Sequence, residues 1–289
     1  MLYRNFSNQD EIDREYNPRL RVEQTDQYLT KYLSESERVS KTLNHQDGIQ
    51  YGPTLNEVLD YYPSSEAQAP LVCFIHGGYW HAFSSRDFAF ITEALHFQGF
   101  SVAHINYSLC PEVTLDEIVR QCRAALAWLF RNADALGFNP EKIGVAGHSA
   151  GGHLTGMLLA TNWEHDYGLS SNLIRAAFPI SGLFDLRPFP FSWLQPKLQF
   201  NLEQVMRNSP LFLECPGDSK VKVLVGGDES EEFQRQSSDY SKHLRKQGID
   251  TDFTIIQKKH HFNLLDDFLG KGGEITQLIT QTMRSEEHT

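Results

Sequence analysis

Short apolar runs alternate with longer segments of helical periodicity along much of the chain. A short apolar run predicts a buried strand, and apolar residues that recur every three or four positions predict an amphipathic helix. Strands are expected at 71–75, 101–106, 143–146, 176–180, 221–226 and 252–256. Helices are expected at 87–98, 114–136, 151–161, 231–247 and 264–283. This alternation predicts an α/β fold with a mostly parallel central sheet and helices on both faces.

Two regions depart from the alternation. Residues 1–45 are polar and predict a helical segment that packs against the body of the protein. Residues 183–215 contain four of the twelve prolines and a cluster of aromatic residues, so neither a long strand nor an uninterrupted helix is expected there. A long irregular insertion is often functional, and we interpret this one as a cap over the mouth of a site. The alternative is a surface excursion whose aromatic side chains pack on the sheet. We find no linker, so a single domain over 1–289 is expected.

Ser149 lies in the pattern Gly-x-Ser-x-Gly, directly after the predicted strand 143–146 and before the predicted helix 151–161. This strand–turn–helix context is typical of a nucleophilic serine held on a strained turn. Small residues two positions before and after the serine are needed because the backbone is crowded there. The alternative is that Ser149 is only a small residue at a tight turn.

A nucleophilic serine also needs hydrogen-bond donors for the oxyanion, a base, and an acid that orients the base. The strand-end sequence His76-Gly-Gly resembles the oxyanion loop of esterases, so we expect the donors to be the backbone N–H groups of Gly78, Tyr79 and Ala150. His76 itself is interpreted as a structural residue that braces the loop. The glycines let the backbone approach a substrate oxygen closely.

The base and the acid are expected after the last strands, in the chain order serine, acid, histidine. His260 and His261 follow the predicted strand 252–256, and they cannot easily both point at the serine. Asp228 and Glu229 follow the strand 221–226. Residue chemistry alone does not separate the two carboxylates.

The composition of the chain limits the kinds of molecule that the protein is expected to bind. The formal net charge of −11 argues against nucleic acid and anionic membrane surfaces. Neither a signal peptide nor an apolar stretch approaching the ~18 residues of a membrane span is recognisable, so a cytoplasmic protein is expected. No residues have metal-ligand spacing and no phosphate-binding glycine loop is present, so no metal and no cofactor are expected.

The expected partner is a small-molecule substrate, with the oligomeric state, monomer or homodimer, left open. The four cysteines contain no C-x-x-C pair, and three of them, Cys73, Cys110 and Cys122, are expected to be buried in a reducing compartment.

Several motifs together resemble the kynurenine formamidase (arylformamidase) family of α/β-hydrolases. They are "HGGYW" (76–80), "YSLCPEVTL" (107–115), "GHSAGGHL" (147–154), "RNSP" (207–210), "EFQRQS" (232–237) and "HHFNLL" (260–265). The resemblance implies an α/β-hydrolase fold, with Ser149 as nucleophile and His261, rather than His260, as base. It places the acid on Glu229, where many eukaryotic members carry aspartate, so Asp228 remains the alternative acid.

The resemblance further implies hydrolysis of N-formyl-L-kynurenine or a related aryl formamide to the amine and formate. Trp80, Phe83 and the cap are expected to hold the aromatic leaving group. Arg86 and Arg187 are candidates for binding a substrate carboxylate, although each is more typical of a surface or structural arginine. A carboxylesterase for small acyl esters would explain the motifs equally well, whereas a non-catalytic binding module would not need all of these groups intact.

Overall fold

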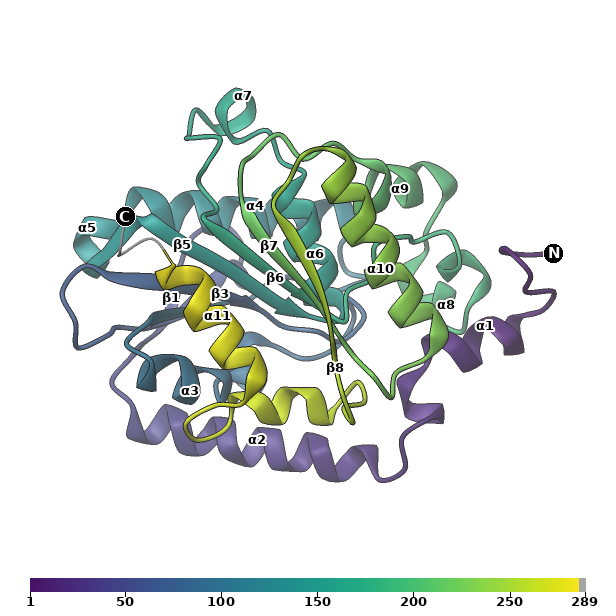
Figure 1. Ribbon diagram of the computed structural model, residues 1–289, viewed down its shortest axis with the longest axis horizontal. Helices are drawn as coiled ribbons and strands as arrows, with labels where there is room; N and C mark the ends of the chain where they lie inside the picture. Colours follow the sequence, from purple (N-terminus) through teal and green to yellow (C-terminus); the bar gives the residue numbers. More distant parts are fainter. Residues whose placement is uncertain (286–289) are drawn as a thin grey trace.

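A twisted sheet of eight strands forms the centre of the molecule (Figure 1). The computed structural model describes residues 1–285 and orders the strands β1-β2-β4-β3-β5-β6-β7-β8. Strands β1 and β2 pair antiparallel, β2 pairs antiparallel with β4, and all other neighbours are parallel. The α/β prediction is therefore confirmed. The strands are β1 (Gln46–Gln50), β2 (Val58–Tyr62), β3 (Ala69–Ile75), β4 (Ser101–Ile105), β5 (Phe138–His148), β6 (Ala176–Ile180), β7 (Lys220–Gly226) and β8 (Thr251–Ile256).

Helices cover both faces of the sheet. Helices α2 (Thr25–Thr42), α3 (Ile91–Phe97) and α11 (Glu274–Arg284) lie below the sheet in Figure 1, whereas α4 (Leu115–Arg131), α6 (Ala150–Leu159) and α10 (Glu231–Lys246) lie above it. The two groups pack into two separate clusters of buried apolar side chains. The shorter helical elements of the body are η2 (Ser85–Phe88), α5 (Ala133–Leu136), α7 (Trp163–Tyr167) and η5 (Asn263–Phe268).

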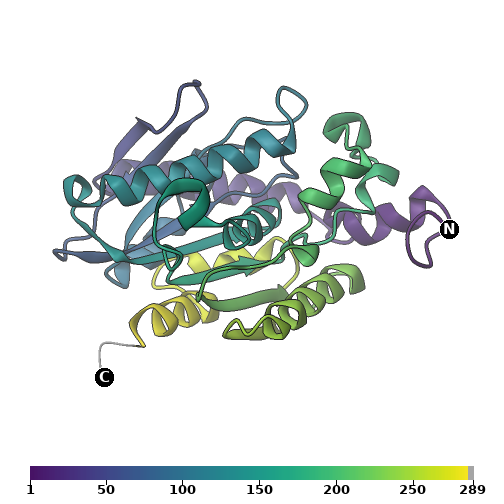
Figure 2. The ribbon, with the colours of Figure 1, turned by 90° about the horizontal axis from the view of Figure 1, so that it is seen from above.

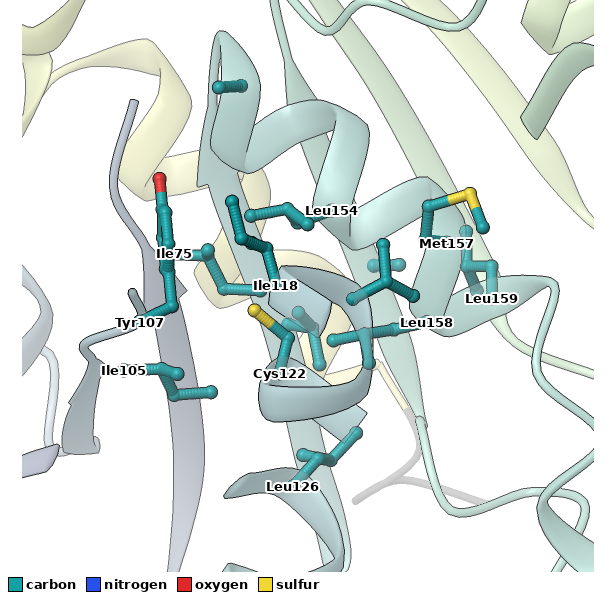
Figure 3. Close-up of a cluster of buried hydrophobic side chains, with 14 of the residues drawn as sticks. Ile75, Ile105, Tyr107, Ile118, Cys122, Leu126, Leu154, Met157, Leu158 and Leu159 are labelled. Carbon is teal, nitrogen blue, oxygen red and sulfur yellow. The ribbon is translucent and has the colours of Figure 1, made fainter. Parts of the chain in front are cut away.

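Strand β3 shows why the central strands are apolar without interruption. Cys73 and Ile75 belong to the cluster under α4 and α6, while Val72 and Phe74 belong to the cluster on the opposite face. Successive side chains of a strand point to opposite faces, so a strand covered on both faces must be apolar at every position. Figure 3 shows side chains of α4 and α6 meeting those of β3 and β4, among them Ile75, Ile105, Ile118, Cys122, Leu154 and Leu158.

The six predicted strands are confirmed, but two more were missed. Strand β1 is almost entirely exposed and contains Gly48, and it pairs at the sheet edge, so its sequence lacks an apolar pattern. The single helix predicted at 264–283 is wrong, because the chain forms η5 and α11 with a turn between them. Gly270 and Gly272 occupy this turn at φ 60° and 85°, values that interrupt a helix. The helix predicted at 114–136 ends at Arg131, and α5 follows after Asn132.

The two irregular regions of the sequence lie side by side. The N-terminal region forms α1 (Gln9–Tyr16), η1 (Pro18–Leu20) and α2. The insertion forms only short helices, namely η3 (Phe189–Phe191), α8 (Gln195–Leu198), α9 (Leu202–Arg207) and η4 (Pro210–Phe212). Figure 2 shows α1 next to the insertion, and the backbone N–H of Trp193 donates to the Asp13 carboxylate at 3.0 Å. Within the described residues, none of the helices is long and apolar enough to cross a bilayer.

Candidate active site

Ser149 lies on a strained turn between β5 and α6. Its backbone has φ 59° and ψ −118°, in the positive-φ region that side chains other than glycine seldom adopt. Its N–H donates to the carbonyl of Ile180 at 2.9 Å, which ties the turn to the end of β6. The serine is therefore held in a conformation of the kind that exposes a nucleophile above a parallel sheet.

The glycines around Ser149 are required by close backbone contacts. A Cβ at Gly147 would lie 2.2 Å from the carbonyl oxygen of Gly151, and a Cβ at Gly151 would lie 1.9 Å from that of Ile75. A Cβ at Gly77 would lie 3.2 Å from the Cβ of Ser149. The small residues of Gly-x-Ser-x-Gly thus permit the turn to pack against the end of β3.

His261 and Glu229 form a buried pair. The Nδ1 of His261 lies 2.6 Å from Oε2 of Glu229, and since an ionised carboxylate only accepts, the ring nitrogen donates. The other oxygen, Oε1, accepts from the hydroxyl of Ser181 and from the N–H of Gly226, the latter at 2.8 Å. The carboxylate is thus fixed from two sides, by β6 and by the end of β7. Ser181 was not anticipated from the sequence.

The two alternative residues point elsewhere. Asp228 has an exposed side chain, and its N–H donates to the carbonyl of Lys259. The Nδ1 of His260 accepts from the N–H groups of Phe262 and Asn263, both at 3.2 Å. Burial lowers the pKa of His260. The structure therefore brings Glu229 and His261 together and leaves Asp228 and His260 outside the pair.

The three predicted oxyanion donors have no internal backbone acceptor. Within residues 1–285, the N–H groups of Gly78, Tyr79 and Ala150 donate to none of the backbone carbonyls. Gly78 has φ 107°, and Tyr79 has φ 49°, so the loop is tightly folded. Ala150 is the first residue of α6, where N–H groups have no partner inside the helix. These groups are available to a ligand atom.

His76 braces the oxyanion loop. Its ring stacks on that of Tyr107 with centroids 4.2 Å apart, and its Nδ1 lies 2.8 Å from the carbonyl oxygen of Gly77. The Tyr107 hydroxyl donates to the backbone carbonyl of His76 at 2.8 Å. Burial lowers the pKa of His76 to about 4, so the ring is neutral at pH 7. Its placement fits the structural role expected for it.

Trp80 does not contact the cavity, which corrects the expectation that it binds substrate. Its side chain is fully buried, and its indole N–H donates to Nδ1 of His153 at 3.2 Å. The Nε2 of His153 in turn lies 2.7 Å from the backbone carbonyl oxygen of Asn208. A large side chain with one N–H donor is well suited to this internal position. Trp80 therefore links the oxyanion loop to α6.

A cavity of about 270 Å³ opens beside Ser149 and His261. Phe83, predicted to contact substrate, lines it, as do Trp193 and Leu194 of the insertion. The sequence analysis missed the contribution of the N-terminal region. That region supplies Asn17, Pro18, Arg19, Leu29 and Tyr32 to the lining.

Neither of the two candidate arginines for binding a substrate carboxylate lines this cavity. Arg187 pairs with the buried Asp185 through two nitrogens, at 2.7 and 2.9 Å. Arg86 lies on the surface near Asp47 and Asp60. Arg187 is thus a structural residue whose charge is neutralised by a buried carboxylate, and Arg86 is a surface residue outside the cavity.

His148, between Gly147 and Ser149, is an additional polar residue of the site. Its ring centroid lies 4.5 Å from that of His261, and its Nε2 has no hydrogen-bond partner among the described residues. Burial and the neighbouring His261 hold the pKa of His148 well below its usual value. The residue is therefore neutral beside the nucleophile. Across residues 1–285, no three His, Cys, Asp or Glu side chains are grouped as metal ligands would be.

The eight-stranded sheet, the strained serine after β5 and the buried histidine–carboxylate pair after the last strands define an α/β-hydrolase. The family model BD-FAE matches residues 59–184. Kynurenine formamidase of Danio rerio is 29% identical over 259 residues, which cover 87% of this chain and 86% of the fish protein. Kynurenine formamidase of Drosophila melanogaster is 28% identical over 243 residues, covering 81% and 80% of the two chains. The chain is a homologue of the kynurenine formamidases, and the family resemblance drawn from its motifs is confirmed.

Solved structures show the same architecture. A crystal structure from Silicibacter sp. TM1040, described as a candidate thioesterase, superimposes with a TM-score of 0.83 and 29% identity, covering 93% of this chain and 99% of that one. An esterase of Pyrobaculum calidifontis superimposes with a TM-score of 0.73 at 19% identity, over 90% and 92% of the two chains. The latter likeness shows the fold alone.

Proposed function

We propose that the protein hydrolyses an aryl formamide, with N-formyl-L-kynurenine as the leading substrate, to the aryl amine and formate. The observation that carries the proposal is the similarity to kynurenine formamidases along at least four-fifths of both chains. The cavity supports it, because aromatic and aliphatic side chains such as Phe83, Trp193 and Leu194 suit an aryl leaving group.

Acyl transfer would proceed in two steps at Ser149. His261 takes the hydroxyl proton at Nε2 as the serine oxygen attacks the formyl carbon, and Glu229 stabilises the imidazolium that forms. The N–H groups of Gly78, Tyr79 and Ala150 stabilise the oxyanion. The C–N bond then breaks, and His261 gives its proton to the leaving aniline nitrogen.

Water completes the reaction. His261 removes a proton from a water molecule, whose oxygen attacks the formyl ester of Ser149. The ester bond breaks, the serine oxygen recovers the proton, and formate leaves. Because the acyl group is a single formyl carbon, discrimination among substrates must come from the leaving group.

A carboxylesterase activity toward small acyl esters is the second candidate. Esterase LipC of Mycobacterium tuberculosis is 29% identical over 127 residues, covering 43% of this chain and 32% of that protein. The comparison of kcat/KM for N-formyl-L-kynurenine and p-nitrophenyl acetate tests the choice. We expect the formamide to be preferred, and a protein that cleaves the ester but not the formamide would be an esterase.

The protein is proposed to act in the cytoplasm on a small molecule, without nucleic-acid or membrane partners. All four cysteines are buried and free, as expected in a reducing compartment. The net charge of −11 opposes binding to polyanionic surfaces.

A further inference from the structure

The cavity beside Ser149 has a single permanently charged group. Among the described residues that line it, Arg19 is the only Lys, Arg, Asp or Glu. The remaining polar lining is neutral at pH 7 or belongs to the proposed chemistry; burial lowers the pKa of both His81 and His148. An otherwise apolar cavity with one guanidinium favours a ligand that is aromatic and anionic.

The guanidinium of Arg19 is weakly engaged. Its nearest carboxylate is that of Asp26, at 3.4 Å, and the two side chains are 56% and 88% exposed. An exposed ion pair of this length is readily exchanged for a better partner. Arg187, by contrast, is held by two short contacts to a buried carboxylate. Arg19 is therefore free to turn toward an anion at the opening of the cavity.

The backbone that carries Arg19 is firmly held. The N–H of Arg19 donates to the side chain of Asn17, which caps η1, and Pro18 is buried. The preceding Tyr16 donates through its hydroxyl to Glu232 at 2.5 Å, and its carbonyl accepts from the hydroxyl of Tyr79 in the oxyanion loop. The backbone of Arg19 thus has a fixed position relative to the predicted oxyanion donors, while its side chain can turn.

We propose that Arg19 binds the carboxylate of the substrate and makes the enzyme selective for anionic aryl formamides. The inference rests on the proposed function. Arg19 lines the same cavity as Ser149, Phe83 and Trp193, and its side chain is largely exposed. A substrate with its formyl group at Ser149 can therefore extend its carboxylate toward the solvent side of the cavity, where Arg19 can form two parallel hydrogen bonds to it.

The same lining contains no counterpart for an ammonium group. None of the described lining residues is an aspartate or glutamate. The enzyme should therefore recognise the carboxylate of an amino-acid substrate and be indifferent to its amino group. Removing the amino group should leave KM nearly unchanged, whereas removing the carboxylate should raise it.

The test compares Arg19→Gln with wild type on four formamides. They are N-formyl-L-kynurenine, its decarboxylated analogue, its desamino analogue and neutral formanilide. Loss of a charge-assisted pair should raise KM for the two carboxylate-bearing substrates by about 10- to 100-fold, with kcat within about twofold. The decarboxylated analogue and formanilide should be unaffected by the substitution, and Arg19→Lys should restore part of the loss.

Arg14→Gln is the matched control, because it removes the same charge from the same region. Arg14 is exposed, donates to the carbonyl of Asp10 and does not line the cavity, so this variant should behave as wild type. In wild type, KM for the anionic substrates should also rise with ionic strength, and in Arg19→Gln it should not.

The inference is overturned if Arg19→Gln changes all four substrates equally, which indicates a structural role, or changes none. It is also overturned if wild type accepts the decarboxylated analogue as well as N-formyl-L-kynurenine. If none of the formamides is cleaved, the proposed function fails instead. The role of Arg19 is then decided with p-nitrophenyl acetate and a carboxylate-bearing aryl acetate, where the same selective rise in KM supports it and its absence refutes it.

Discussion

Replacing Glu229 by glutamine should remove most of the activity through the tautomer of His261. The Oε1 of Glu229 accepts from two donors, the Ser181 hydroxyl and the Gly226 N–H. In Glu229→Gln, the amide oxygen must occupy this position, because an NH₂ group there would meet two other donors. The NH₂ group then faces Nδ1 of His261.

This arrangement forces the proton of His261 onto the wrong nitrogen. Nδ1 has to accept from the amide, so the neutral ring carries its hydrogen on Nε2 and cannot take the proton of Ser149. In serine hydrolases, the corresponding change costs about 10⁴-fold in kcat. At about 1.4 kcal/mol per factor of ten, this corresponds to roughly 5 kcal/mol of lost transition-state stabilisation.

The assay is steady-state hydrolysis of N-formyl-L-kynurenine or the best substrate found, with the melting temperature as a control for folding. Asp228→Asn is the matched variant, since it makes the same chemical change one residue earlier on an exposed side chain. It should stay within about twofold of wild type. The assignment is refuted if Asp228→Asn loses as much activity as Glu229→Gln, or if Glu229→Gln keeps a tenth of the wild-type kcat.

Three further predictions concern the nucleophile, the base and pH. Ser149→Ala should abolish hydrolysis at an unchanged melting temperature, and substantial residual turnover would contradict the triad. His261→Ala should be comparably severe and His260→Ala mild; the opposite ranking in kcat would move the base by one residue. The free energy of unfolding should fall as the pH drops from about 6.5 toward 4, because histidines of the unfolded chain bind protons in this range while the buried histidines of the folded protein stay neutral. Each such histidine should lower this free energy by up to about 1.4 kcal/mol per pH unit. Urea titrations at pH 7.5 and 5.0 measure this free energy of unfolding, and equal values at the two pH values would contradict the prediction. The histidines concerned are His76, His104 and His153, whose pKa values burial lowers to about 4, 3 and 4.

The parts of the fold that sequence could predict are those whose cause is local. A strand covered on both faces must be apolar throughout, so β3 and β6 were recognisable as short apolar runs. The turn at Ser149 was recognisable because Gly147 and Gly151 leave no room for a Cβ. The edge strand β1 has no such constraint, and its polar sequence gave no indication of it.

The choice between Glu229 and Asp228 depended on contacts that lie far apart in the sequence. Ser181 is 48 residues from Glu229, and His261 is 32 residues away. Residue chemistry alone therefore does not decide between Glu229 and Asp228, and only the family resemblance favours Glu229. Trp80 shows the converse error, since an aromatic residue in a motif beside the nucleophile proved to be packed inside the protein.

The proposed catalytic residues and part of the cavity wall come from different regions of the fold, and these regions differ in how tightly the sheet constrains them. The proposed chemistry depends on Ser149, Glu229 and His261, all of which follow strands of the sheet and have little freedom to move. Part of the cavity wall comes instead from the N-terminal region and the insertion, which are joined by the contact between Asp13 and Trp193. Substitutions such as Arg19→Gln can therefore change which leaving group is accepted without disturbing the sheet. Selectivity in this molecule should accordingly vary through residues 1–45 and 183–215, while the reaction itself stays tied to the strand ends.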